Sequence, residues 1–292
     1  MGLNAANRAF VGIVLVAGAV FGLFAGTACW VFSMVAYTVV TDGLTALTDF
    51  GTLAAILLIV LLVATIALAV RSLRTQLVNT RHLGNWVRDR SRPLPAMLVE
   101  AAGQAGLGGR VDLVDGDGAF SFAYGITRPR VAVSVRLVDS LSGEELGAVL
   151  DHERYHVVNY DPLKVVLARS LPDALFFLPA LAELRGRYVA ARELAADRRA
   201  MRSAGPAPVA GALYKVVAGP PGVDLGAAAA IGGGEALDAR VDQLESGTEP
   251  PMRPLSRNRV LASVVGGGVL VAAAAASFIS FVPLMAKLCT GR

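Results

Sequence analysis

The chain has 292 residues, of which 54% are hydrophobic and 17% are charged, and its formal net charge is +4. Because soluble domains carry a charge on roughly a quarter of their residues, this composition excludes an ordinary soluble enzyme. It predicts an integral membrane protein with a modest soluble part, built from one or two domains.

Three apolar segments are long enough to cross a bilayer as helices. Residues 9–41 contain no charge, residues 52–70 are rich in Leu, Ile and Val, and residues 260–286 are again uncharged. A spanning helix needs about 20 apolar residues, and the first run is too long for a signal-peptide core. We expect two transmembrane helices within residues 1–70 and a third, with a short tail, within residues 257–292. The protein is then a multi-pass protein of the cell (plasma) membrane, in contact with the lipid bilayer.

Arginines closely follow the second apolar segment. Six of them lie between residues 71 and 92, whereas the only charges between the first two segments are Asp42 and Asp49. The positive-inside rule predicts that such an arginine-rich stretch lies in the cytoplasm. Because juxtamembrane basic residues are expected on that side, we prefer this interpretation to nucleic-acid binding and expect no direct nucleic-acid partner.

The soluble elements begin after the arginine-rich stretch. Residues 93–106 have the composition of a helix that starts near Pro and ends at Gly. Short runs with the character of β-strands follow at residues 110–115, 118–125 and 130–139. We expect a small antiparallel sheet. Ser142 and Glu145 then form a capping box at the start of a further helix.

That helix contains the sequence LDHERYH, in which His152 and His156 are four residues apart and Glu153 lies between them. Residues four apart lie on one face of a helix, so both imidazoles can bind one metal ion. Glu153 can then take the proton of a zinc-activated water that attacks a carbonyl, which is the chemistry of the H-E-x-x-H motif. The alternative is a solvated amphipathic helix that carries two histidines by chance.

Residues 163–184 are apolar but contain two prolines and four charged residues. The segment is short for a complete span, and arginine-rich stretches stand on both sides of it. We expect an apolar hairpin or a kinked membrane segment. Residues 185–256 then form a second cytoplasmic part, with one helix within residues 205–219 and another within residues 235–246. An Ala, Gly and Pro-rich connection between these helices has the composition of a flexible region.

A catalytic zinc ion usually has three protein ligands and an open position. The helical run VAARELAADRRAM supplies Glu193 as the candidate third ligand. Asp197, four residues later, can accept a hydrogen bond from a ligating imidazole. The alternative is that both acids pair with neighbouring arginines on a solvated face. We interpret Asp161 as a residue of the helix end before Pro162.

Several motifs together resemble the core of the BlaR/MecR-type membrane zinc metallopeptidases. They are His152 to His156, Asp161-Pro162-Leu163, the apolar segment to Leu184, and Arg192-Glu193 with Asp197. The strand run and helix before the motif are also similar to the broader HtpX/Ste24-type gluzincins.

The resemblance implies an α-helical membrane protein with an embedded α+β gluzincin (zincin-like) metallopeptidase domain. Its small antiparallel sheet would pack on the zinc-site helices, and residues 71–162 and 185–256 would be its two halves. One Zn²⁺ ion would be bound by His152, His156 and Glu193. Glu153 would be the catalytic base, and Asp197 would support a ligating histidine.

In gluzincins, an edge strand above the zinc helix pairs with the backbone of the peptide substrate. By resemblance, the substrate-binding strand is formed by Val131, Ala132, Val133, Ser134 and Val135, or by the run from Phe120 to Tyr124. The alternative is a plain sheet edge with no role in binding.

The BlaR-type sensors carry a large extracellular penicillin-binding domain after the last span, where this sequence has only a few residues. We therefore expect no antibiotic sensing within the chain. The first functional hypothesis is a zinc endopeptidase that cleaves a protein substrate, such as a transcriptional repressor, at the cytoplasmic face. The alternatives are an HtpX-like quality-control protease and a non-catalytic membrane signalling protein that retains the fold. The complete ligand set favours an enzyme.

Overall fold

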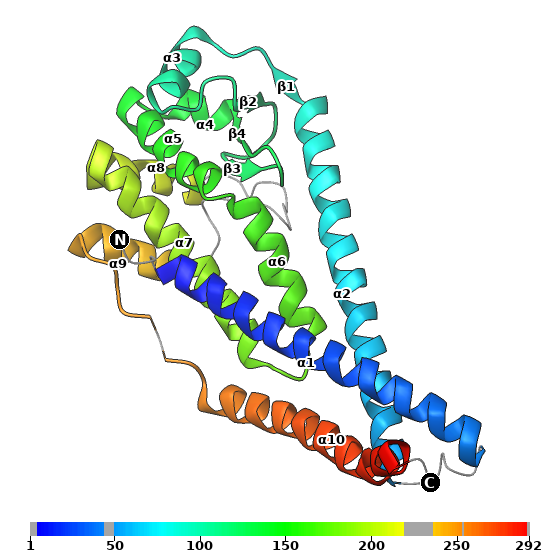
Figure 1. Ribbon diagram of the computed structural model, residues 1–292. Coiled ribbons are helices and arrows are strands. Elements are labelled where there is room, and N and C mark those ends of the chain that lie inside the picture. Colours follow the sequence, from blue (N-terminus) through cyan, green and yellow to red (C-terminus); the bar gives the residue numbers. More distant parts are fainter. Residues whose placement is uncertain (1–4, 44–49, 219–235, 253, 291–292) are drawn as a thin grey trace. The chain divides into compact units, whose positions relative to one another are not determined.

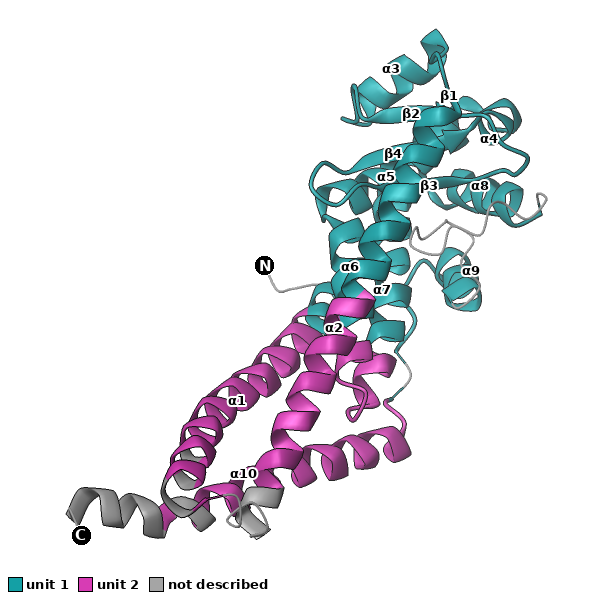
Figure 2. Ribbon diagram, turned by 90° about the vertical axis from the view of Figure 1, so that its right-hand side faces the viewer, with its two compact units in different colours: residues 1–10, 73–170, 185–254 teal, residues 11–72, 171–184, 255–292 magenta. Residues whose placement is uncertain are grey.

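The computed structural model describes residues 5–43, 50–218, 236–252 and 254–290. These residues form helices α1 to α10 and strands β1 to β4 (Figure 1). The chain divides into two compact units, coloured separately in Figure 2. Unit 1 consists of residues 1–10, 73–170 and 185–254, and unit 2 of residues 11–72, 171–184 and 255–292.

Three helices of the described residues are long and apolar enough to cross a membrane. They are α1 (Ala5–Asp42), α2 (Phe50–Asp89) and α10 (Arg257–Thr290). The apolar stretches within them have mean hydropathies of 2.4, 2.7 and 2.0. Each contains one of the three predicted spans, which confirms the prediction of an α-helical membrane protein.

Residues 171–184 pack with the membrane helices in unit 2. They include the end of α6 (Asp161–Ala174) and the start of α7 (Ala180–Ala204). Leu175, Leu178 and Leu181 form a buried apolar cluster with Ala17 of α1. The Ala180 N–H donates to the Ser263 hydroxyl of α10 at 2.9 Å. A hairpin or kinked membrane segment over residues 163–184 remains a prediction, and this packing supports it.

Unit 1 contains a four-stranded sheet in the order β1-β2-β4-β3. The strands are β1 (Ser91–Arg92), β2 (Val111–Val114), β3 (Ser121–Tyr124) and β4 (Arg130–Ser134). β2 pairs with β4 in parallel, while β1 with β2 and β3 with β4 are antiparallel. The predicted small sheet is therefore present, but it is mixed, and the prediction that it is antiparallel is wrong for the pairing of β2 with β4. After β2, the chain forms β3 at the far edge of the sheet and leaves one strand position empty between them. β4 then fills this position and runs parallel to β2.

The predicted edge strand over residues 131–135 is also wrong. β4 lies between β2 and β3 and pairs with both, so its backbone groups already have partners. Val135 belongs to α4 (Val135–Ser140), because the Ser134 hydroxyl accepts a hydrogen bond from the Leu137 N–H and caps that helix. Within the described chain, β3 and β1 are the edges, which leaves the alternative run from Phe120 to Tyr124 at an edge.

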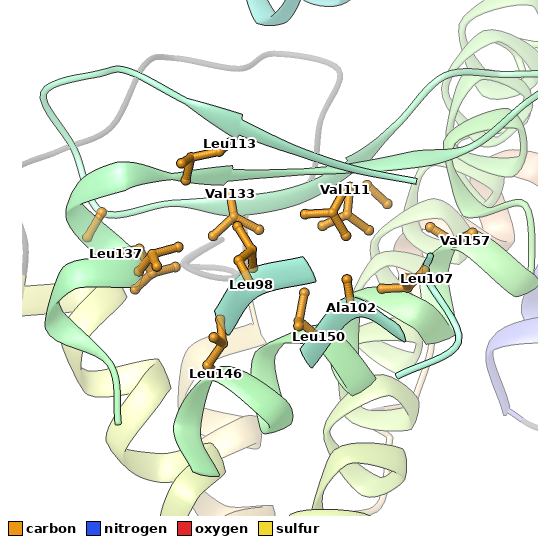
Figure 3. Packing of buried hydrophobic residues seen from close by; sticks show 14 residues of the cluster. Leu98, Ala102, Leu107, Val111, Leu113, Val133, Leu137, Leu146, Leu150 and Val157 are labelled. Carbon is orange, nitrogen blue, oxygen red and sulfur yellow. The ribbon is translucent and has the colours of Figure 1, made fainter. Parts of the chain in front are cut away.

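The core of unit 1 lies between the sheet and helices α3 (Ala96–Gln104) and α5 (Gly143–Val158). In Figure 3, Leu98 of α3 and Leu150 of α5 face Val111 and Val133 of the strands. Burying one such side chain contributes roughly 1.5–3 kcal/mol. The predicted capping box is confirmed, because the Ser142 hydroxyl accepts from the Glu145 N–H and the Glu145 carboxylate from the Ser142 N–H. This cap sets where α5 begins.

The opposite face of the sheet packs on the last turns of α2. Phe120, Phe122 and Ala132 form a second buried cluster with Leu83 and Val87. Every second residue of β3 therefore faces α2, and the residues between them face α5.

The two helices predicted after residue 203 are present in unit 1. They are α8 (Pro206–Ala218) and α9 (Leu237–Ser246). The predicted flexible connection between them, residues 219–235, lies outside the described residues. α8 packs on α5, with Ala212 and Leu213 in a buried cluster with Val149.

Candidate metal centre

Helices α5 and α7 bring the three predicted ligands together. The Nε2 atoms of His152 and His156 lie 3.2 Å apart. Glu193 Oε2 is 3.5 Å from His152 Nε2, and Glu193 Oε1 is 3.7 Å from His156 Nε2. All three side chains are buried, and one ligand atom from each lies within 4.8 Å of the others. The helical spacing of four residues places both histidines on one face of α5.

Each histidine is held at its other ring nitrogen by a carboxylate. His152 Nδ1 lies 2.8 Å from Asp197 Oδ1, and His156 Nδ1 lies 2.7 Å from Asp161 Oδ2. When Nδ1 carries the proton and donates it to the carboxylate, the lone pair of Nε2 points into the cluster. The contact of Asp197 was predicted from its spacing to Glu193.

The role of Asp161 was missed, because it was interpreted only as a helix-end residue. It is fully enclosed at the first position of α6, and Tyr188 of α7 also donates its hydroxyl to Asp161 Oδ1 at 3.1 Å. Tyr160 before it has a positive φ of 54°, so the chain turns sharply between α5 and α6. This turn brings the first residue of α6 back beside His156. A proline directly after Asp161 was the available signal for a new helix start.

Arg240 was also missed. It comes from α9, is 2% exposed, and donates from Nε and Nη2 to the two oxygens of Asp197 at 2.6 and 2.8 Å. Its Nη1 lies 3.8 Å from Glu193 Oε2. No local sequence pattern predicts this contact, because Arg240 and Asp197 are 43 residues apart. Arg240 neutralises the carboxylate that orients His152.

The cluster has the donor set and the unsatisfied atoms expected of a metal site. Both carboxylate oxygens of Glu193 are buried and have no hydrogen-bond partner among the described residues. Arg192 Nε lies 3.1 Å from Oε1 as an ion pair, but buried oxygens without a hydrogen bond remain costly, and a cation between Glu193 and the two histidines would satisfy them. Two imidazoles and one carboxylate are also a known ligand set for catalytic zinc. The residues present therefore fit a metal ion.

A comparison with protein-family models matches this chain over residues 41–242 to the family described as BlaR1 peptidase M56. The match covers more than half of the chain and includes the whole cluster. The chain belongs to the BlaR1 peptidase M56 family. It is thus a membrane-associated metallopeptidase, and the resemblance to the BlaR/MecR-type enzymes is confirmed. The more distant link to HtpX/Ste24-type gluzincins stays a prediction.

The electrostatics of this M56 peptidase keep the acidic groups of the cluster ionised. Burial alone would raise the pKa of Glu193, but His156, Arg192 and His152 hold it well below its usual range. Burial opposes ionisation of Asp197 as well, and hydrogen bonds from His152 and Arg240 lower its pKa. Burial would lower the pKa of His152, yet its contacts with Asp197 and Glu193 raise it to about 9. The carboxylates of Glu193 and Asp197 therefore favour a positive charge between these groups, which a proton on His152 or a bound metal ion can supply.

Glu153 lies beside the ligands and is completely buried. Its Oε1 accepts a hydrogen bond from the Ser121 hydroxyl of β3 at 2.7 Å, and its Oε2 has no partner among the described residues. Burial raises the pKa of Glu153, against the opposing effect of His152 and His156. The carboxylate thus has one fixed oxygen and one available oxygen. The contact with Ser121 was not predicted, since 32 residues separate the two in the chain.

Proposed function

We propose that this M56 peptidase is a zinc endopeptidase that cleaves a protein substrate at the cytoplasmic face of the cell membrane. One observation carries the proposal. The Nε2 atoms of His152 and His156 and the carboxylate of Glu193 converge in one buried cluster, and each histidine has an aspartate at its other nitrogen. Such carboxylate-histidine pairs are typical of zinc sites.

In this proposal His152, His156 and Glu193 hold one Zn²⁺ ion. Asp197 and Asp161 fix the ring orientations of the two histidines, and Arg240 holds Asp197 in place. The zinc ion, when bound, acts as a Lewis acid that allows water to attack a carbonyl at neutral pH. Anionic Glu193 offsets part of the charge of the ion, and its low pKa keeps it available as a ligand.

Glu153 serves as the general base through Oε2. Since Oε1 is bonded to Ser121, Oε2 is the oxygen that accepts the proton of the attacking water. The same oxygen then delivers the proton to the amine of the departing peptide, so the carboxylate ends the cycle in its initial state. The buried setting excludes bulk water, which strengthens these interactions.

The edge strand β3 is the proposed place for the substrate backbone. The Ser134 N–H donates to the Phe120 carbonyl, and hydrogen-bonded pairs alternate along an antiparallel ladder. The next such pair is then Phe122 with Ala132, so the N–H and C=O groups of Ser121 and Ala123 face away from β4. These groups can pair with an extended peptide. Ser121 is fully buried, so the cover of this edge must move before a peptide can pair there.

The charge pattern and the connections of α1 and α2 support a cytoplasmic site. Six arginines follow the second apolar segment, as the positive-inside rule expects of a cytoplasmic stretch. Asn7 near the start of α1 accepts a hydrogen bond from Lys164 at 2.9 Å, and Phe10 packs on Tyr188 with 5.5 Å between ring centroids. Residues 73–89 of α2 belong to the same unit. If α1 crosses the membrane outward and α2 crosses back, the start of α1 and the end of α2 lie on the same side, as their common membership of unit 1 requires.

A regulatory substrate, such as a transcriptional repressor, suits the closed site better than general quality control does. His152, Glu153 and Glu193 are each at most 4% exposed, and we infer that a conformational change gives a peptide access to them. An enzyme with such a requirement is suited to control by a signal. We expect cleavage of one or a few regulators.

Quantitative proteomics on cells that carry the wild type or Glu153→Gln tests this function. Accumulation of one or a few full-length regulators in Glu153→Gln, with loss of their cleavage products, would support it. Accumulation of many membrane proteins would favour an HtpX-like quality-control protease instead. An unchanged proteome under conditions in which the wild type is expressed would contradict protease activity and favour a non-catalytic signalling protein.

A further inference from the structure

The hydroxyl of Ser121 makes a contact that the ligand set alone does not require. Ser121 Oγ lies 2.7 Å from Glu153 Oε1, and both residues have 0% relative exposure. The other oxygen of Glu153 is buried without a hydrogen-bond partner among the described residues. A single side chain from the sheet therefore makes the two oxygens of this carboxylate unequal.

The alternation of β3 explains why this serine reaches α5. Phe120 and Phe122 pack in the cluster on the α2 side of the sheet, and Ala119 and Ala123 pack in the cluster on the α5 side. Ser121 lies between the two phenylalanines in the chain, so its side chain faces α5. An apolar residue at this position would fill the same space, but it would leave Glu153 Oε1 without its donor.

We propose that Ser121 is a positioning residue for the peptidase reaction, which acts by fixing the carboxylate plane of Glu153. This inference rests on the proposed function, in which Glu153 is the general base. The hydrogen bond at Oε1 stops the carboxylate from rotating and presents Oε2 to the attacking water. Holding a base in its reactive orientation accelerates the step that it catalyses, because the side chain then loses less orientational freedom on reaching the transition state.

The same residue links the base to the substrate strand. The backbone N–H and C=O of Ser121 face the outer edge of the sheet, where an extended peptide would pair, and its side chain contacts the base. Pairing of a peptide with β3 thus fixes the backbone of the residue that orients Glu153. Loss of the hydroxyl should then reduce kcat while the KM for a protein substrate stays nearly the same.

The test uses the full-length protein loaded with cobalt in place of zinc, because cobalt takes the same ligands and gives a visible absorption spectrum. The probe is acetohydroxamate, a bidentate ligand for metals whose hydroxyl can bond a nearby carboxylate. Its dissociation constant is measured for the wild type, Ser121→Ala, Ser121→Thr, Glu153→Gln, and the double variant of Ser121→Ala with Glu153→Gln. Ser170→Ala is the matched control, since Ser170 is buried in α6 and its hydroxyl has no partner in the described chain.

We expect every variant to retain cobalt. Acetohydroxamate should bind about tenfold more weakly to Ser121→Ala, because the Glu153 carboxylate that Ser121 no longer holds must be ordered when the probe binds. Ser121→Thr should bind within about twofold of the wild type, because it keeps the hydroxyl. The double variant should bind no more weakly than Glu153→Gln alone, because both changes act through one group.

The other outcomes separate this inference from the proposed function. Unchanged affinity in Ser121→Ala beside weakened binding in Glu153→Gln overturns the role of Ser121 alone. Loss of cobalt from Ser121→Ala, or an equal effect in Ser170→Ala, makes Ser121 a structural residue and also overturns it. Absence of cobalt binding in the wild type, or no effect of Glu153→Gln, overturns the proposed function and the inference with it.

Discussion

His156 Nδ1 lies 2.7 Å from Asp161 Oδ2, although Asp161 belongs to the helix that follows the motif helix. The hydroxyl of Tyr188 bonds the second oxygen of the same carboxylate at 3.1 Å. Asp161 therefore orients one histidine of the cluster as Asp197 orients the other. The orientation of the two histidines depends on the turn between α5 and α6 as well as on the H-E-x-x-H spacing.

We predict that Asp161→Ala weakens metal binding by about 10–100-fold, the usual effect of losing a carboxylate that orients a ligating histidine. Competition with a chelator of known zinc affinity measures the change. Asp151→Ala is the control, because Asp151 is a half-buried carboxylate on α5, directly before His152. Equal affinities of the wild type and Asp161→Ala would rule out this role for Asp161.

Arg240→Leu should strongly destabilise unit 1. The change leaves the fully buried Asp197 carboxylate without the guanidinium that bonds both of its oxygens. Breaking one partner of a buried ion pair costs about 3–5 kcal/mol. Denaturant unfolding of the purified protein in detergent measures the free energy of unfolding. Arg199→Leu on the exposed side of α7 should change it by less than about 0.5 kcal/mol, and a similar loss in both variants would contradict the prediction.

We expect Asp112 to make the stability of the protein depend on pH in the acid range. Burial raises the pKa of this carboxyl, but hydrogen bonds from Arg130 and Tyr124 outweigh burial and lower it. A carboxylate with a lowered pKa in the folded state stabilises the fold above its unfolded pKa of about 3.9, and this stabilisation is lost as the pH falls through the folded pKa. Asp112→Asn should therefore lose about 1–3 kcal/mol at pH 7.

The same variant should lose less additional stability than the wild type when the pH falls below about 4. Unfolding curves of both proteins at neutral and acid pH measure the difference. Parallel losses of stability in the two proteins on acidification would show that Asp112 has no lowered pKa.

The hairpin that carries the edge strand depends on Gly125. This residue follows β3 with a φ of 88°, and a Cβ atom there would lie 2.9 Å from the Arg128 carbonyl oxygen. Gly125→Ala should destabilise the protein by at least about 1 kcal/mol. Gly147→Ala is the matched control of opposite sign, because Gly147 is within α5 with open space around it, and alanine there should stabilise the helix by about 0.5–1 kcal/mol. Changes of equal sign in the free energy of unfolding of the two variants, each relative to the wild type, would contradict the assigned turn.

The elements that short-range patterns determine could be predicted from the sequence. Charge-free runs of sufficient length predict α1, α2 and α10, and the Ser142–Glu145 capping box predicts the start of α5. The metal cluster combines two local spacings of four residues, one from His152 to His156 and one from Glu193 to Asp197. In a helix, residues four apart lie on one face, so each spacing alone predicts which side chains point the same way. That the two helices lie against each other was implied by the family resemblance.

The features that could not be predicted from the sequence depend on contacts between distant segments. The parallel pairing of Val111 with Val131 follows from the order in which strands join the sheet, which alternation within one strand does not determine. Ser121 and Arg240 are 32 and 43 residues from their partners. Asp161 is near His156 in the chain, but its contact requires the turn at Tyr160, and a positive φ at tyrosine has no sequence signature.

The zinc content of the purified full-length protein tests the central claim most directly. We expect about one zinc ion per chain in the wild type and in Glu153→Gln, and less than about a tenth of that in Glu193→Ala, since a catalytic site needs its third ligand. Elemental analysis after removal of loosely bound metal gives the ratio. Less than about half an equivalent in the wild type, or an undiminished zinc content in Glu193→Ala, would contradict a metal centre formed by His152, His156 and Glu193.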